Sequence, residues 1–148
     1  MIFVDASALI AIVAGESDAV SLADRLEAEQ LRLCSALSVW ETVAGLCRSY
    51  AFSIPAARNH VRLFLEAGNF QFVSIGEREC EIATDAYAQY GKGRHPAALN
   101  MGDCYAYACA RSNQTKLLFK GDDFTKTDIA PAAASSAATR SSPSMKGT

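Results

Sequence analysis

The sequence lacks a strong charge of either sign. Its 148 residues hold 14 Lys and Arg against 16 Asp and Glu, a formal net charge of −2. Arg140 and Lys146 are the only charges after residue 131, which leaves twelve cations against sixteen acids, a net charge of −4, in residues 1–131. This balance excludes nucleic-acid binding through overall charge, so any such role needs a local basic patch or metal ions.

The sequence also lacks cysteine motifs and long apolar runs. Its five cysteines form no Cys-x-x-Cys pair, which excludes a zinc clip or a thioredoxin-like motif and predicts buried, reduced thiols: they are Cys34, Cys47, Cys80, Cys104 and Cys109. The N-terminal segment has no basic lead-in, and no apolar run approaches the roughly 20 residues of a membrane span. We therefore expect a soluble cytoplasmic protein without membrane contact.

The sequence is rich in apolar residues, and its predicted strands alternate with predicted helices. Half of its residues are hydrophobic, enough for one domain with its own core, which we place at 1–131. Residues 132–148 are low in complexity and predict a disordered tail. Short apolar runs predict strands, and periodic segments with caps predict helices: strands at 1–4, 31–34, 70–75 and 117–119, and helices at 6–15, 18–30, 38–50, 53–67, 77–90 and 101–111. Within these helices, Trp40 and Tyr87 lie on the faces expected to point inward. The order of strands and helices favours an α/β fold with a parallel sheet covered on both faces.

Acidic residues recur where such a sheet forms its sites. Asp5 ends the first predicted strand, Asp122 and Asp123 follow the last, and Glu41 and Asp103 lie near helix starts. Sites in parallel α/β sheets form beyond the carboxyl ends of the strands, so these carboxylates are predicted to converge. Converged carboxylates repel one another, and the common relief is a hard cation such as Mg²⁺ or Mn²⁺.

Each acid also has a structural interpretation. Ser38 to Glu41 and Asn100 to Asp103 both have the spacing of a capping box, and Asp5 is placed to cap the first helix. Asp122 and Asp123 have the composition of a turn. For any one acid taken alone the cap or turn is the favoured interpretation, and spacing does not decide between the two.

Four motifs in series resemble the PIN-domain family, most closely its VapC-type ribonuclease toxins. They are Val4-Asp-Ala-Ser-Ala-Leu9, Ala36-Leu-Ser-Val-Trp-Glu41, the pair 90–95 and 99–105, and Leu117-Leu-Phe-Lys-Gly-Asp-Asp-Phe124 with 127–129. The resemblance spans residues 1 to about 130. It implies a PIN-like three-layer fold with a central parallel sheet of four to five short strands and helices on both faces.

The resemblance also implies a function and its residues. Asp5, Glu41, Asp103 and Asp123 would form the acidic catalytic site of an endoribonuclease that uses Mg²⁺, with Mn²⁺ as alternative, and Asp122 is the near alternative for the fourth acid. Asp5 and Asp103 would bind the metal. Ser7 would hydrogen-bond the site, and cations of nearby loops would guide the RNA backbone: Lys92, Arg94, His95 and Lys120. The implied partners are RNA, a VapB-type antitoxin and a second copy in a homodimer.

Three alternative functions compete with this interpretation. A phosphatase of the haloacid dehalogenase type is disfavoured because it needs a second aspartate at the position of Ser7. A non-toxin PIN nuclease in RNA processing would have the same metal site. A non-catalytic binding module with the PIN fold would keep the acids only as caps, and the presence of all four acids favours catalysis.

Overall fold

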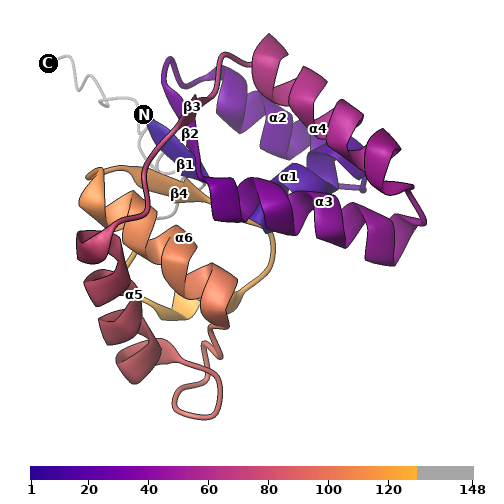
Figure 1. Ribbon diagram of the computed structural model, residues 1–148. Helices are drawn as coiled ribbons and strands as arrows, with labels where there is room; N and C mark the ends of the chain where they lie inside the picture. The colour runs from indigo at the N-terminus through magenta and orange to yellow at the C-terminus, as the bar shows by residue number, and fades with distance from the viewer. Residues whose placement is uncertain (130–148) are drawn as a thin grey trace, which may run out of the picture.

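A four-stranded, entirely parallel sheet forms the centre of the computed structural model, which describes residues 1–129 (Figure 1). The strands are β1 (Ile2–Val4), β2 (Arg32–Cys34), β3 (Gln71–Phe72) and β4 (Lys116–Leu118), in the order β3-β2-β1-β4. The predicted α/β class, the parallel sheet and the coverage of both its faces are confirmed. The tail predicted at 132–148 lies outside the described residues.

In the described part of the chain, residues 1–129, six α-helices and one 3-10 helix surround the sheet. They are α1 (Ala6–Ala14), α2 (Ala19–Glu27), α3 (Ala36–Tyr50), α4 (Ile54–Ala67), α5 (Glu77–Tyr90), α6 (Met101–Ser112) and η1 (Asp123–Lys126). Gly15 ends α1 in the left-handed conformation, and Ser53 with Pro55 starts α4, as the sequence predicts. The second helix is shorter at both ends than the predicted range 18–30.

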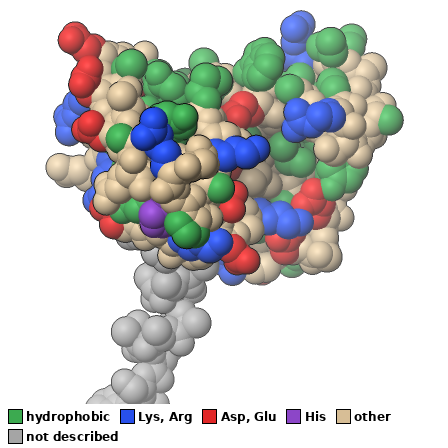
Figure 2. Space-filling view, turned by 90° about the horizontal axis from the view of Figure 1, so that it is seen from below, with side chains coloured by type: hydrophobic (Ala, Val, Ile, Leu, Met, Phe, Trp, Pro, Cys, Tyr) green, Lys and Arg blue, Asp and Glu red, His purple; other side chains and the backbone are tan. Residues whose placement is uncertain are grey.

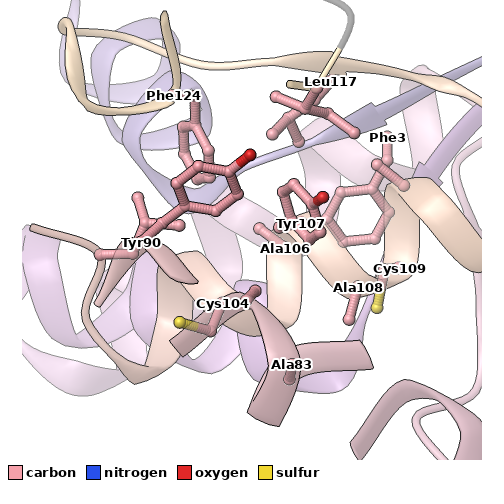
Figure 3. Close-up of a cluster of buried hydrophobic side chains, with 14 of the residues drawn as sticks. Phe3, Ala83, Tyr90, Cys104, Ala106, Tyr107, Ala108, Cys109, Leu117 and Phe124 are labelled. Atoms are coloured by element: carbon pink, nitrogen blue, oxygen red, sulfur yellow. The ribbon is translucent and has the colours of Figure 1, made fainter. Parts of the chain in front are cut away.

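The two faces of the sheet bury separate cores because successive side chains of a strand point to opposite sides. Phe3 of β1 packs beneath α5 and α6 with Tyr90, Tyr107 and Leu117 (Figure 3). Its neighbours Ile2 and Val4 pack on the other face, which α1 to α4 cover (Figure 1). All three β1 side chains are fully buried, so this central strand is fixed from both sides.

Strand pairing sets what lies at the carboxyl edge of the sheet. Phe3 and Val4 pair with Leu117 and Leu118, and the Asp5 amide donates to the Leu118 carbonyl at 2.9 Å. Asp5 therefore emerges beside the loop that follows β4. The third strand is only two residues long, not the predicted run of 70–75, because β3 lies at the sheet edge and pairs with one short neighbour.

Three side-chain placements differ from expectation. Trp40 and Tyr87, predicted to face inward, are 67% and 45% exposed. Cys80 is exposed rather than buried.

Among residues 1–129 no single helix is long and apolar enough to span a membrane. The helices α1 and α2 have that length and composition only when taken together, as a pair bent by 116°.

The start of α3 corrects a prediction that bears on the site. The helix begins at Ala36, and its capping box joins Ser35 and Ser38: the Ser38 amide donates to Ser35 Oγ at 3.1 Å and the Ser35 amide to Ser38 Oγ at 2.9 Å. The box predicted between Ser38 and Glu41 is therefore wrong. Because Ser38 already fills the position that the glutamate of a capping box takes, the Glu41 carboxylate has no capping role.

This cap assignment predicts the effects of two substitutions. Ser35→Ala should destabilise the protein by about 1 kcal/mol, because it removes the acceptor for the Ser38 amide at a buried helix start. Thermal denaturation should then show a melting temperature lower by roughly 4 °C. Glu41→Gln should cause no such loss. A lower melting temperature for Glu41→Gln and an unchanged one for Ser35→Ala would instead support the capping box between Ser38 and Glu41.

Candidate active site

Asp5 is the most buried of the predicted acids. Its side chain is 4% exposed at the N-cap of α1, where Oδ2 accepts from the Ser7 amide at 3.0 Å. Burial raises the pKa of the Asp5 carboxyl, while hydrogen bonds from Ser7 counteract the rise and the nearby Asp123 carboxylate adds to it. The predicted cap is thus present, and the same carboxylate also faces other acids.

Glu41 projects from the second turn of α3 toward two of the other predicted acids. Burial raises the pKa of its carboxyl to about 7, and the charges of Asp5 and Asp103 contribute to the rise. The end of its side chain lies directly against Gly102 in the first turn of α6. Glu41 is therefore a half-buried carboxyl held among like charges.

Asp103 combines a cap with a place in the same group. It forms the predicted capping box of α6, in which Asp103 Oδ2 accepts from the Asn100 amide at 3.0 Å and Asn100 Oδ1 accepts from the Asp103 amide at 2.9 Å. Burial nevertheless raises the pKa of Asp103 to about 6, with the Asp5 and Asp123 carboxylates adding to the rise. The cap and site interpretations of this residue are compatible.

The two adjacent aspartates after β4, Asp122 and Asp123, have different surroundings. Asp123 lies close enough to Asp5 and Asp103 for its charge to raise both of their pKa values. Asp122 precedes η1 without a side-chain cap and is not among the charges that act on those two groups. The structure therefore brings together the four acids Asp5, Glu41, Asp103 and Asp123, with Asp5 and Asp103 in the middle.

This carboxylate cluster, defined by those four residues, has no counter-charge from residues 1–129. Within residues 1–129 no lysine, arginine or histidine forms an ion pair with any of its members. The described residues also contain no three acidic, histidine or cysteine side chains gathered tightly enough to hold an ion directly. Mg²⁺ does not need three, since it is often bound through one or two carboxylates and several waters. An all-oxygen donor set centred on Asp5 and Asp103 fits such a cation.

The predicted phosphate-guiding residues lie on the loop between α5 and α6. Lys92 and Arg94 are exposed, and the Arg94 guanidinium lies 5.1 Å from the ring centre of Tyr87. His95 is half-buried, and its Nδ1 accepts from the Ala97 amide at 3.0 Å. His95 is thus part of the loop's own structure. On the face seen from below, Lys and Arg side chains surround acidic ones near the central hollow (Figure 2).

Lys120, the remaining cation predicted to guide RNA, is held by two acids that follow α1. Its ammonium group pairs with Glu16 and lies 3.4 Å from Asp18, between α1 and α2. Its backbone amide donates to Ser7 Oγ at 3.0 Å. These contacts, which join residues more than a hundred positions apart, hold the loop before Asp123 against α1. No local pattern in the sequence signals them.

An apolar groove of about 880 Å³ runs along α3, from Ala36 to Arg48, and the start of α4. Its lining includes Trp40, Ile54 and Phe72, which are all more than half exposed, and two arginines, Arg48 and Arg58. Trp40 directly precedes Glu41 in the sequence, but none of the four acids of the carboxylate cluster lines the groove.

The fold and the cluster define a class: three-layer α/β domains with carboxylates gathered at the carboxyl edge of a parallel sheet. The family model described as PIN domain matches residues 2–130. A VapC ribonuclease of Mycobacterium bovis, Mb0640, is 40% identical over 130 residues, which cover 88% of this chain and 97% of the relative. VapC42 of Mycobacterium tuberculosis is 41% identical over 130 residues, which cover 87% of this chain and 97% of the relative. The chain belongs to the PIN-domain family, among its VapC ribonucleases.

Solved structures agree with this assignment at the level of the fold. The crystal structure of Mycobacterium tuberculosis VapC20, described as a toxin that cleaves the sarcin–ricin loop, superposes with a TM-score of 0.70 at 17% identity and covers 87% of this chain and 96% of that one. A toxin–antitoxin complex from Klebsiella pneumoniae gives a TM-score of 0.64 at 19% identity, and the match covers 86% of this chain and 93% of that one.

The raised pKa values predict how the metal-free protein responds to pH. A carboxyl whose pKa is higher in the folded than in the unfolded state stabilises the fold at low pH, and this stability is lost as the pH rises through the folded value. The pKa values of Glu41 and Asp103 rise from 4.5 and 3.8 to about 7 and 6 in the fold, which places this loss between about pH 4 and pH 7. In EDTA, the melting temperature should fall by roughly 5 °C over this range.

Glu41→Gln is the matched control because it removes one titrating group while preserving side-chain size. It should flatten the pH dependence and raise the melting temperature at pH 7.5. Adding Mg²⁺ or Mn²⁺ to the wild type should stabilise it more at pH 7.5 than at pH 5. An equal slope in wild type and variant would show that the cluster does not destabilise the fold.

Proposed function

We propose that this chain is the toxic ribonuclease of a toxin–antitoxin pair, a metal-dependent endoribonuclease that hydrolyses RNA phosphodiester bonds. The observation that carries the proposal is the carboxylate cluster without a protein counter-charge. Its support comes from VapC ribonucleases of about 40% identity that the chain matches over nearly their whole length. PIN-domain VapC ribonucleases are generally metal-dependent, and the oxygen-only donor set favours Mg²⁺, with Mn²⁺ as alternative.

The proposed chemistry divides the roles among the four acids. A bound divalent cation lowers the pKa of water and neutralises charge on the phosphate, which is the chemistry this reaction requires. Asp5 and Asp103 would hold it, because they lie in the middle of the cluster and are fixed by their helix caps. Glu41 and Asp123, on either side, would accept hydrogen bonds from the attacking water. Ser7 would keep Asp5 oriented through its amide.

Substrate binding in this proposal relies on local cations rather than net charge. Lys92 and Arg94 are exposed beside the start of α6, where they would contact the RNA backbone. His95 would act mainly by ordering their loop, through the hydrogen bond that Nδ1 accepts from Ala97. Lys120, paired with Glu16, would act by holding the loop of Asp123.

An antitoxin partner is part of the proposal, and so is a homodimer. The Klebsiella pneumoniae neighbour is a toxin–antitoxin complex, which supports a VapB-type antitoxin. The groove lined by Trp40, Ile54 and Phe72 supports the binding of a protein partner along α3, because an exposed apolar surface of this kind is typical of an interface.

The alternative of a non-catalytic module, with acids kept only as caps, is disfavoured by Glu41. Its carboxylate caps nothing, since Ser35 and Ser38 fill the capping box of α3, and yet it lies half-buried among like charges at a cost in stability. A PIN nuclease of RNA processing would share the metal site, so toxicity must be tested separately.

The first test compares cleavage of total small RNA by wild type and Asp5→Asn in Mg²⁺, Mn²⁺ and EDTA. Asparagine keeps an acceptor for the Ser7 amide, so the helix cap and fold should survive. We expect metal-dependent cleavage by the wild type, abolished by EDTA and reduced on the order of 100-fold in the variant. Equal cleavage by both proteins would mean a contaminating nuclease. No cleavage by folded, metal-loaded wild type would favour the binding module.

The doubled aspartate provides a matched pair within the same turn. Asp123→Asn should lower the cleavage rate strongly, whereas Asp122→Asn should leave it nearly unchanged, because only Asp123 acts on Asp5 and Asp103. The reverse result would assign the fourth position of the site to Asp122. Melting temperatures of both variants check that the turn remains folded.

Toxicity is tested in cells. Induced expression of the wild type in a bacterial host should arrest growth, and Asp5→Asn should not, at equal protein levels. Co-expression of the protein encoded beside it should relieve the arrest if that protein is the antitoxin. Normal growth despite RNA cleavage by the purified protein would favour an RNA-processing nuclease.

A further inference from the structure

We infer that Gly102 is a positioning residue of the proposed nuclease site: the absence of a side chain at this position makes the space in which the Glu41 carboxylate lies. This inference rests on the proposed function and assigns a role to a residue that contributes no chemical group of its own.

The geometry that carries the inference is a close approach between two helices. A Cβ atom built on Gly102 would lie 1.9 Å from Glu41 Oε2 and 2.5 Å from Oε1, far inside van der Waals contact. The three nearest atoms to that position all belong to the Glu41 carboxyl group. Gly102 is buried, so the carboxylate fills the place that any other side chain would take.

Backbone conformation does not require glycine here. Gly102 lies in the first turn of α6 and is not among the glycines with positive φ, which are Gly15, Gly93 and Gly121. Alanine forms helices better than glycine by about 1 kcal/mol, so glycine at this helical position sacrifices stability. A glycine that neither φ nor helix propensity requires indicates a steric need, and the Glu41 contact supplies one.

The position of Gly102 explains how this contact acts on the site. It directly precedes Asp103, one of the two central acids, and Glu41 reaches the cluster from a different helix, α3. The glycine thus lets α3 deliver a carboxylate to within reach of Asp5 and Asp103. A methyl group would push the flexible end of Glu41 aside and leave the two helices where they are.

The test is a double-substitution cycle on the full chain in Mg²⁺ or Mn²⁺, scored by kcat and KM for RNA cleavage. Gly102→Ala should keep or raise the melting temperature and lower kcat about 100-fold, with KM nearly unchanged. In a Glu41→Asp background the shorter side chain leaves room for the methyl group, so adding Gly102→Ala should change kcat less than about threefold. Gly76→Ala is the matched control, because a Cβ there meets only Glu79 Oε1 at 3.8 Å.

A crystal structure of Gly102→Ala provides a readout independent of activity. Glu41 Oε2 must move by about 1.5 Å to widen the 1.9 Å approach to the 3.4 Å of ordinary contact. Wild-type activity retained by Gly102→Ala, equal losses in both backgrounds, or an unmoved carboxylate would overturn the inference while leaving the proposed nuclease intact. Absence of cleavage by the wild type would instead overturn the proposed function.

Discussion

The constraint that the rest of the structure must meet is the mutual repulsion of carboxylates gathered beside the end of β1. Asp5, Glu41 and Asp103 all have raised pKa values, and burial is the largest cause in each case. Such a cluster destabilises the fold that contains it unless a cation neutralises it. The rest of the structure must therefore be stable enough to hold these groups together, and two cores packed on either side of β1 provide that stability.

Three of the four acids are held by contacts that also stabilise the local structure. Asp5 caps α1, Asp103 closes the capping box of α6, and the loop of Asp123 is held by Lys120 and Ser7. Glu41 is the exception, because no cap fixes it and its placement depends on contact with Gly102. For Asp5 and Asp103, the helix cap is compatible with the catalytic role that we propose for the same side chain.

The sequence predicted some parts of this site better than others, and the reason is the range of the interactions involved. The start of α4 at Ser53 and the end of α1 at Gly15 follow from local chemistry and are confirmed. The start of α3 was misplaced because Ser35 and Ser38 both have capping side chains, and the sequence contains two boxes in overlapping registers. Trp40 was expected inside because apolar character does not say which face of a helix is covered.

The sequence by itself determined the α/β class, the parallel sheet and the family, because strand–helix alternation and short motifs are written in consecutive residues. Tertiary structure alone decided that the charge of Asp123 acts on the pKa of Asp5, that Lys120 pairs with Glu16, and that Gly102 makes room for Glu41. These contacts join residues of separate helices and loops. Their geometry is set by how the elements pack, and spacing along the chain carries no record of it.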